Sequence, residues 1–197
     1  MPPSTASKAR PQRDKRELIM SAALKLFVER GFYGTAVPEI AEHAGVGAGT
    51  IYRYFDSKEA LVNAVYREHK LAFGNYVMAS LPKGASFREL FHQLWQRMVA
   101  FAVDNPSSLV FLELHHHAPY LDADSRAVEH RITDLIGGVI TAAQARGELK
   151  RGDPTVLMSL VMGAFVGMIR GCVGNARPLG EADWELTEQC MWEAIRV

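Results

Sequence analysis

Residues 37–58, VPEIAEHAGVGAGTIYRYFDSK, constrain the fold of this chain more than any other segment. Their first part places apolar residues at helical spacing until Gly45, and glycine commonly follows the last residue of a helix because it tolerates a left-handed backbone. Their second part places Ile51 and Phe55 four residues apart, so both lie on one face of a second short helix. The segment therefore predicts two short helices joined by a tight turn, with Val46 packed between them.

The second predicted helix carries polar and aromatic side chains away from its buried pair. A helix that enters the DNA major groove needs short side chains at its leading end, where its backbone comes closest to the bases, and phosphate-reaching groups on its flanks. Glycine and alanine occupy positions 47–49, and two tyrosines and an arginine follow at 52–54. The pattern predicts a recognition helix, although a packing corner with half-buried tyrosines would give the same spacing.

A phosphate site is predicted directly after the recognition helix. Ser57 can cap a third helix that begins at Lys58. This would place a cation beside the free N–H groups of a helix amino terminus, where a phosphate could bind.

Residues 14–73 resemble the DNA-binding domain of the TetR family of one-component transcriptional regulators. The resemblance implies an all-α fold, in which an amino-terminal three-helix helix-turn-helix DNA-binding domain is followed by a larger six-helix ligand-binding and dimerisation domain. The matching motif is a threonine, then IA, AGV, Y-x-x-F and SKE-x-L at the family spacing. Its residues here are Thr35, Ile40, Ala41, Ala44, Gly45, Val46, Gly49, Thr50, Tyr52, Phe55, Ser57, Lys58, Glu59 and Leu61.

Three residues depart from the family pattern at positions that face DNA. Gly47 stands where relatives usually have Ser or Thr, so the recognition helix lacks a side-chain cap, at a cost of about 1 kcal/mol or less. Ala36 replaces the usual hydroxyl cap of the preceding helix, and Pro38 replaces a polar or basic residue. We therefore expect few base contacts, with Ala48 against thymine methyl groups, Arg53 on guanine, and more reliance on phosphates and DNA shape. The candidate DNA-binding residues are Thr35, Pro38, Gly47, Ala48, Gly49, Thr50, Tyr52, Arg53, Tyr54 and Lys58.

Charge divides the chain into a basic and an acidic part. Residues 1–70 hold eleven Lys and Arg against eight Asp and Glu, whereas residues 71–197 hold eleven against fourteen. This asymmetry is expected if only the amino-terminal part touches phosphate. The basic residues before residue 14 could follow the DNA backbone or remain in a solvated tail. The expected divisions are a flexible basic arm at 1–13, a helix-turn-helix DNA-binding domain at 14–58 with its motif at about 36–55, and a ligand-binding and dimerisation domain at 59–197.

Helical periodicity recurs along the whole chain, and no segment shows the alternation of a strand. The first helix ends at Gly31, and later helices are separated by proline, glycine or Asp-rich breaks. Beyond the helix-turn-helix, the expected helices cover 59–81, 86–104, 106–117, 124–146, 154–174 and 182–196.

Cysteine usage and the absence of a signal pattern favour a cytoplasmic protein. Cys172 and Cys190 lie in apolar helical stretches without metal-ligand spacing, as in reduced intracellular proteins. The first residues contain no apolar stretch like that of a secretory signal. The uncharged run at 154–169 is shorter than the ~20 residues of a membrane span, so it predicts a buried helix and no membrane partner.

Within this run, small residues recur every four positions and leave one helix face almost without side chains. Such a face lets two helix backbones approach closely, and the resemblance implies a four-helix dimer interface shared with the final helix. The glycines could instead make room for side chains of the same subunit or for a ligand. The predicted interface residues are Ser159, Gly163, Gly167, Gly171, Trp184 and Met191.

The resemblance also implies a ligand site in the carboxy-terminal domain. Aromatic and methionine side chains there favour an apolar pocket for a hydrophobic effector, aromatic or acyl, although each of them would serve equally as ordinary core. The candidate lining residues are Trp95, Met98, Phe101, Phe111, Leu114, His115, Met162, Phe165 and Met168.

Three consecutive histidines, His115, His116 and His117, raise the alternative of a metal site. Helical metal ligands favour a spacing of three or four residues, and adjacent histidines point in different directions. Only Glu113 with His117, or His116 with Tyr120, has a suitable spacing. The histidines could equally complement a helix carboxy terminus or give a ligand one polar contact.

The sequence contains no nucleophile elbow, phosphate loop or zinc-protease motif, so we expect neither an enzyme nor a bound cofactor. The resemblance implies a repressor that binds a palindromic operator on double-stranded DNA as a homodimer, and is released by a small, hydrophobic ligand. The first alternative is a metal- or pH-responsive regulator that uses His115–His117. The second is an interaction module without a DNA role.

Overall fold

The computed structural model describes residues 14–79, 84–115, 117–175 and 179–197, so the predicted arm at 1–13 lies outside the described residues. All the regular secondary structure of the described residues is helical, apart from an isolated bridge between Leu149 and Arg196. The predicted all-α fold is therefore confirmed. The chain divides into two compact units, Met1–Val62 and Asn63–Val197.

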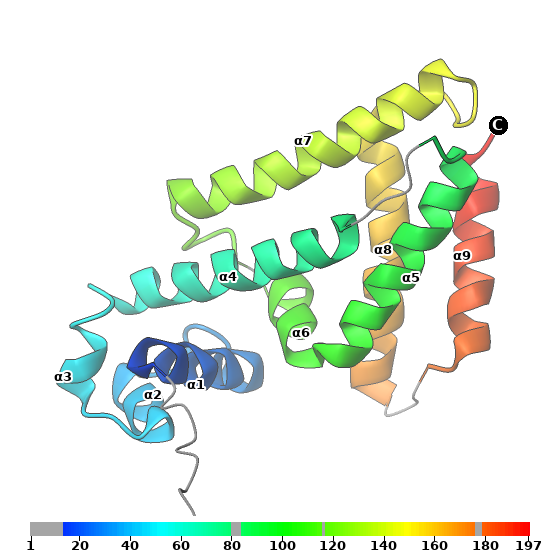
Figure 1. Ribbon diagram of the computed structural model, residues 1–197. Helices are drawn as coiled ribbons and strands as arrows, with labels where there is room; N and C mark the ends of the chain where they lie inside the picture. The colour runs from blue at the N-terminus through cyan, green and yellow to red at the C-terminus, as the bar shows by residue number, and fades with distance from the viewer. Residues whose placement is uncertain (1–13, 80–83, 116, 176–178) are drawn as a thin grey trace, which may run out of the picture. The chain divides into compact units, whose positions relative to one another are not determined.

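The first unit contains α1 (Lys15–Arg30), α2 (Val37–Ala44), α3 (Ala48–Ile51) and the first turn of α4 (Lys58–Met78) (Figure 1). Helix α1 packs on α2, and α2 packs on α3. Apolar side chains from all four helices are almost completely buried in this unit, as the amphipathic spacing of the sequence requires. They include Ile19, Ala23, Leu26, Ile40, Ile51 and Leu61.

A left-handed glycine makes the predicted turn between α2 and α3. Gly45 has φ 66° and ψ 34°, and its N–H donates to the Glu42 carbonyl at 3.1 Å. The next N–H, of Val46, donates to the Ala41 carbonyl at 3.0 Å. These two bonds satisfy carbonyl groups that a helix end would otherwise leave unpaired.

The recognition helix α3 is only one turn long, shorter than its pattern suggests. Beyond Ile51 the backbone continues in hydrogen-bonded turns, in which the N–H groups of Tyr54 and Phe55 both donate to the Ile51 carbonyl at 2.9 Å. Ile51 and Phe55 are buried, as predicted. The predicted Ser57 cap is also present, since its hydroxyl accepts from the Ala60 N–H at 3.0 Å.

The division between the units falls inside α4, at Val62 instead of the predicted residue 58. Leu61 and Val62 are fully buried, so the first turn of α4 belongs to the core of the first unit. Phe73 and Val77, later in the same helix, are buried in the second unit. Helix α4 thus contributes to both hydrophobic cores.

The second unit contains the rest of α4 with α5 (Phe87–Asp104), α6 (Pro106–Leu114), α7 (Ala123–Ala145), α8 (Pro154–Asn175) and α9 (Glu181–Ile195). Helix α8 packs against α6, α7 and α9, and α5 packs against α6 and α9 (Figure 1). The nine helices of the described residues match the expected number.

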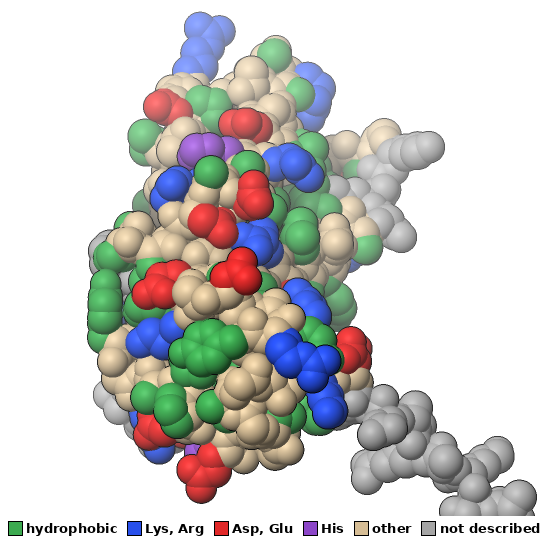
Figure 2. Space-filling view, turned by 90° about the vertical axis from the view of Figure 1, so that its left-hand side faces the viewer, with side chains coloured by type: hydrophobic (Ala, Val, Ile, Leu, Met, Phe, Trp, Pro, Cys, Tyr) green, Lys and Arg blue, Asp and Glu red, His purple; other side chains and the backbone are tan. Residues whose placement is uncertain are grey.

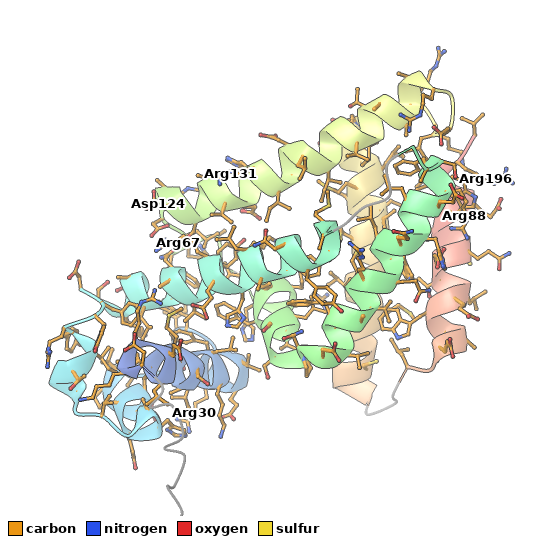
Figure 3. The ribbon with its side chains drawn as sticks, in the orientation of Figure 1. Arg30, Arg67, Arg88, Asp124, Arg131 and Arg196 are labelled. Carbon is orange, nitrogen blue, oxygen red and sulfur yellow. The ribbon has the colours of Figure 1, made fainter. Side chains whose placement is uncertain are left out.

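Polar contacts fasten α4 to the start of α7. The Asn63 side chain donates to the Tyr120 carbonyl at 2.8 Å and accepts from the Asp122 N–H at 2.9 Å. One turn later, the Arg67 guanidinium donates to the Asp122 carboxylate at 2.8 Å and to the Ser125 hydroxyl at 3.0 Å. Figure 3 labels Arg67 on α4. Any shift of this part of α4 along α7 would break these bonds.

A second set of contacts joins α4 to α6. The Ser108 hydroxyl and His69 Nδ1 are 2.8 Å apart, and Lys70 forms a largely buried ion pair with Glu113 at 3.4 Å. Burial lowers the pKa of the His69 imidazole and raises the pKa of the Tyr66 phenol. His69 is therefore expected to be neutral at pH 7, where it can accept the serine proton.

The prediction that residues 154–169 form a buried helix is wrong for the single chain. Pro154–Cys172 is long and apolar enough to cross a membrane by length and composition, but only 11% of this window is buried in the described structure. Phe165 and Ile169 face the core, whereas Val156 and Leu160 are 64% and 45% exposed. The reason is that the helices of the same chain that pack against α8, which are α6, α7 and α9, cover only one side of it.

We expect Gly45→Ala to lower the free energy of unfolding by about 1 kcal/mol, because a Cβ strains a backbone at positive φ. Gly49→Ala is the matched control, since Gly49 lies in α3 without positive φ and a Cβ there meets nothing within 4 Å. Chemical denaturation of both variants measures the difference. Equal stabilities would show that the turn at Gly45 carries no strain.

Candidate nucleic-acid interface

The outer side of α3 and its following turn carry exposed aromatic and basic side chains. Tyr52 and Tyr54 are 54% and 39% exposed, and Arg53 between them is also exposed. Figure 2 shows hydrophobic and basic groups close together on the face of the first unit that carries α3. Phenol hydroxyls and a guanidinium in these positions can donate hydrogen bonds to the phosphate groups of DNA.

The leading end of α3 is open and free of bulky side chains. Gly47 has an extended backbone, φ −71° and ψ 146°, and no side chain caps the helix, as its sequence predicts. Gly47, Ala48 and Gly49 are all exposed, and Thr50 is half-buried. Their small size allows the backbone of α3 to approach the floor of a DNA groove.

The start of α2 is capped by a carboxylate that the sequence analysis missed. The Ala36 N–H donates to Glu39 Oε2 at 2.9 Å, and the Arg30 guanidinium pairs with the same carboxylate at 2.5 Å. The hydrogen bond from Ala36 and the Arg30 charge lower the pKa of Glu39. Pro38 beside it is exposed. Glu at the third helical position was the available signal, because it completes a capping interaction without a hydroxyl at the cap.

Thr35 does not belong to the DNA-facing surface. It is only 2% exposed, and its hydroxyl lies 2.8 Å from the Gly31 carbonyl and 3.2 Å from the Leu26 carbonyl. These carbonyls belong to the last turns of α1 and to the glycine that follows it, so the buried threonine hydroxyl binds the end of this helix. Its prediction as a DNA-binding residue is therefore wrong.

The Lys58 ammonium group forms most of its contacts within the protein. It donates to the Phe32 carbonyl at 2.9 Å and to the Thr35 carbonyl at 3.0 Å, and lies 4.2 Å from the centre of the Phe32 ring. These contacts use two of its three protons and join the first turn of α4 to the segment between α1 and α2. Its predicted phosphate contact would therefore depend on the remaining proton.

A separate, apolar pocket of about 100 Å³ lies in the second unit. Among the predicted lining residues, Trp95, Met98 and Met162 line it. The prediction missed the larger part of the lining, since most of it comes from aliphatic residues that resemble ordinary core in sequence. The missed residues include Met78, Phe91, Leu94, Ile140, Met158 and Val161.

The other predicted pocket residues lie elsewhere in the second unit. Phe101 packs edge to face on Phe73, and Phe165 packs between Trp95 and Trp184, so both phenylalanines fill the core. Phe111 packs on His117, Met168 lines a different hollow beside α9, His115 is half-buried near Phe111, and the Leu114 side chain lies outside the described residues. None of the described side chains among these lines the apolar pocket.

The described part of the histidine segment 115–117 packs within the protein, where His117 has a structural role. His117 is buried, with Nδ1 2.7 Å from the Tyr120 hydroxyl and Nε2 2.6 Å from the Phe111 carbonyl. Nε2 therefore carries a proton and Nδ1 accepts, which leaves neither nitrogen for a metal. His116 lies outside the described residues, among which no group of three His, Cys, Asp or Glu side chains could hold a metal ion.

The predicted interface residues fall on two different sides of α8 and α9. Ser159, Gly163 and Gly167 are exposed, and Gly171 is half-buried. Trp184 instead faces the core of its own subunit, where its carbonyl accepts from the Trp95 indole N–H at 3.1 Å. Its assignment to a dimer surface is therefore wrong. Met191 is half-buried.

A three-helix unit with an exposed recognition helix, joined by a shared helix to a larger helical unit with an apolar pocket, defines a helix-turn-helix DNA-binding regulator. The family model for the bacterial regulatory proteins of the tetR family matches residues 19–65. The model for the tetracyclin repressor-like carboxy-terminal domain matches residues 66–197. The chain therefore belongs to the TetR family of transcriptional regulators.

Individual relatives cover most of the chain. A crystal structure of a tetR family transcription regulator from Shewanella sp. PV-4 has 29% identity and a TM-score of 0.82, covering 94% of this chain and 100% of the other. The fatty acid metabolism regulator protein of Bacillus subtilis is 26% identical over 157 residues, 78% of this chain and 81% of the relative. The uncharacterised HTH-type transcriptional regulator YvkB of the same species is 24% identical over 160 residues, 78% of this chain and 82% of the relative.

We expect Lys58→Met to destabilise the protein by about 1–2 kcal/mol, because two carbonyl groups lose their donor. Lys25→Met is the control, since it makes the same chemical change at an exposed position of α1. Thermal unfolding of both variants distinguishes them. A stability loss no greater than that of the control would show that the ammonium contacts contribute nothing to folding.

Proposed function

We propose that the protein is a homodimeric repressor that binds a palindromic operator and leaves it when an apolar small molecule enters the second unit. The observation that carries this proposal is the exposed set Tyr52, Arg53 and Tyr54 beside the small residues that begin α3. In a member of this family, that surface is the DNA-binding surface implied by the motif. The remaining steps of the proposal rest on α8 and on the apolar pocket.

Dimerisation is supported by the outward side of α8 and α9. A Cβ added at Gly163, Gly167 or Gly171 would meet nothing within 4 Å, so the same subunit does not fill the space beside these glycines. Exposed apolar residues border them, with Val156 and Leu160 on α8 and Leu186 on α9. An apolar helix face of this kind is stabilised when a second copy covers it.

A dimer also suits operator recognition. One recognition helix contacts only a few base pairs, whereas two related by a twofold axis contact half-sites about one helical turn, ~34 Å, or a near multiple of it apart. Arg53 is the proposed guanine contact, and Ala48 the proposed contact to thymine methyl groups. We assign Pro38, Gly47, Gly49 and Thr50 to positions close to the groove.

Ligand control is supported by the position of the pocket along α4. Val77 and Met78 of α4 line the pocket, and the first turn of the same helix lies in the core of the DNA-binding unit. A ligand that binds the non-DNA-binding conformation ~100-fold better shifts the equilibrium by ~2.7 kcal/mol. The name of the Bacillus subtilis relative, a fatty acid metabolism regulator, agrees with an apolar effector.

We expect Arg53→Ala to weaken operator binding by about 10- to 100-fold, through loss of a bidentate guanine contact. The operator is first selected from random DNA with the wild-type protein, and affinity is then measured by gel shift. Arg151→Ala, in the exposed turn between α7 and α8, removes the same charge and is expected to bind normally. Unchanged affinity of Arg53→Ala would refute recognition by α3.

Gly163→Trp is expected to convert the dimer to a monomer, because the ring would occupy the space needed by the facing α8. Gly138→Trp, at an exposed position of α7 where a Cβ meets nothing within 4 Å, is the matched control. Multi-angle light scattering at micromolar concentration gives the mass of each variant. A wild-type monomer, or a Gly163→Trp dimer, would contradict this interface.

A further inference from the structure

Among the described residues, the Trp95 indole is the only polar side-chain group that lines the apolar pocket. Its described lining comes from α4, α5, α7 and α8, with Leu149 from the turn between α7 and α8 and Ile195 from the end of α9. All these residues are aliphatic, aromatic or methionine. Its volume, about 100 Å³, is close to that of an engineered cavity of ~150 Å³ that binds benzene. A ligand group in this space gains dispersion and hydrophobic contacts but no charged partner.

The polar backbone and indole groups of the lining residues are already hydrogen-bonded within the protein. The Trp95 indole donates to the Trp184 carbonyl at 3.1 Å, and the Phe87 N–H donates to the Glu148 carboxylate at 2.6 Å. The Ile195 carbonyl accepts from the Lys150 N–H at 2.9 Å. A hydroxyl or carboxyl group placed deep in the pocket would therefore lose its water without gaining a partner.

The shape of the lining favours a chain over a rigid ring system. Phe87, Phe91 and Trp95 follow one face of α5 over eight residues, a length of ~12 Å, and so form an elongated wall. Methionine side chains, including Met158 and Met162 of α8, line the pocket elsewhere. Methionine is unbranched and adapts its rotamers, so this lining can follow a flexible hydrocarbon.

A polar hollow lies close to one end of the pocket, where α5 begins and α9 ends. Arg88 and Arg196 line it, and Figure 3 shows both at this end of the unit. Arg88 pairs with the buried Glu188 carboxylate at 2.6 Å, and Arg196 pairs with Glu193 at 2.6 Å. Each guanidinium thus has a carboxylate partner, and an anionic ligand head would have to compete with it.

We propose that the effector is recognised by an unbranched hydrocarbon tail of six or more carbons, and that its polar head stays in solvent at the mouth of the pocket. The inference rests on the proposed ligand-binding function of this unit. Under this proposal, the affinity of the protein depends on the length of the hydrocarbon tail and depends little on the chemical type of the head group. A second polar group at the far end of the chain is expected to weaken binding at least ~10-fold.

The direct test is calorimetric titration of the full-length protein with octanol, octanoate, octylamine and octane-1,8-diol. The first three are expected to bind within about fivefold of one another, whereas the diol is expected to bind at least ~10-fold more weakly than octanol. Along the series from butanol to decanol, affinity is expected to rise up to about fourfold per methylene until the pocket is full. A preference of tenfold or more for octanoate, or a diol that binds as well as octanol, would overturn the proposal.

Two methionine variants locate the site. Met162→Gln keeps the side-chain length and places an amide in the pocket, and is expected to weaken octanol binding at least ~10-fold. Met168→Gln makes the same change in the hollow beside α9 and is expected to bind octanol normally. Thermal unfolding and operator affinity without ligand verify that both variants fold. Loss of binding in Met168→Gln alone would place the ligand in the other hollow and refute the assignment.

Operator release is measured separately, so the two proposals can fail independently. If octanol binds the wild-type protein but leaves the operator complex intact, tail recognition stands and ligand-induced release is refuted. If none of the chains binds up to its solubility limit, tail recognition is refuted, even if another compound releases the operator.

Discussion

The structure depends on one constraint, which is that α4 must bury apolar residues in two different hydrophobic cores. Leu61 and Val62 lie in the core of the first unit, and Phe73 and Val77 lie in that of the second. Displacing either set exposes several large apolar side chains, at roughly 1.5–3 kcal/mol for each one fully exposed. In the proposed mechanism, a ligand that contacts Val77 would act on a helix whose displacement costs free energy in both units. The proposed link between the two cores is therefore the shared burial of α4 side chains, and not a particular hydrogen bond.

The basic residues of the DNA-binding unit serve two different purposes. Lys58 and Arg30 are committed to carbonyl or carboxylate groups of the same unit, where they fix the segments around α2. Arg53 and the flanking tyrosines remain on the surface. The net charge of a sequence segment overstates the charge available to DNA, because some cations stabilise the fold instead. No side chain caps α3 at Gly47, so the position of α3 depends on the packing of Ile51 and Phe55.

Local features of this chain were predictable from sequence, and features that depend on distant partners were not. Gly45 and Ser57 act on groups within a few residues, so their roles follow from spacing alone. The Lys58 ammonium binds carbonyls 23 and 26 residues earlier in the chain, which no local pattern encodes. The assignment of Trp184 to the dimer interface was wrong for another reason. A helix such as α9 has two sides, and hydrophobicity alone does not say whether an aromatic ring faces the core of its own subunit or a partner. The predicted pocket lining was partly wrong for the same reason, because residues that line a pocket and residues that fill a core are of the same apolar types.

The chemistry of the pocket limits what kind of selectivity the regulator can have. A cavity whose polar groups are all satisfied can reject a misplaced hydroxyl strongly, since the hydroxyl would be buried without a partner. It distinguishes chains that differ by one methylene only weakly, by up to about fourfold, since one buried methylene contributes about 0.8 kcal/mol. Such a protein responds to a class of hydrocarbon tails instead of a single metabolite. A carboxylate-specific regulator would need an unpaired cation at the pocket, whereas Arg88 and Arg196, which line the polar hollow near its end, already have carboxylate partners.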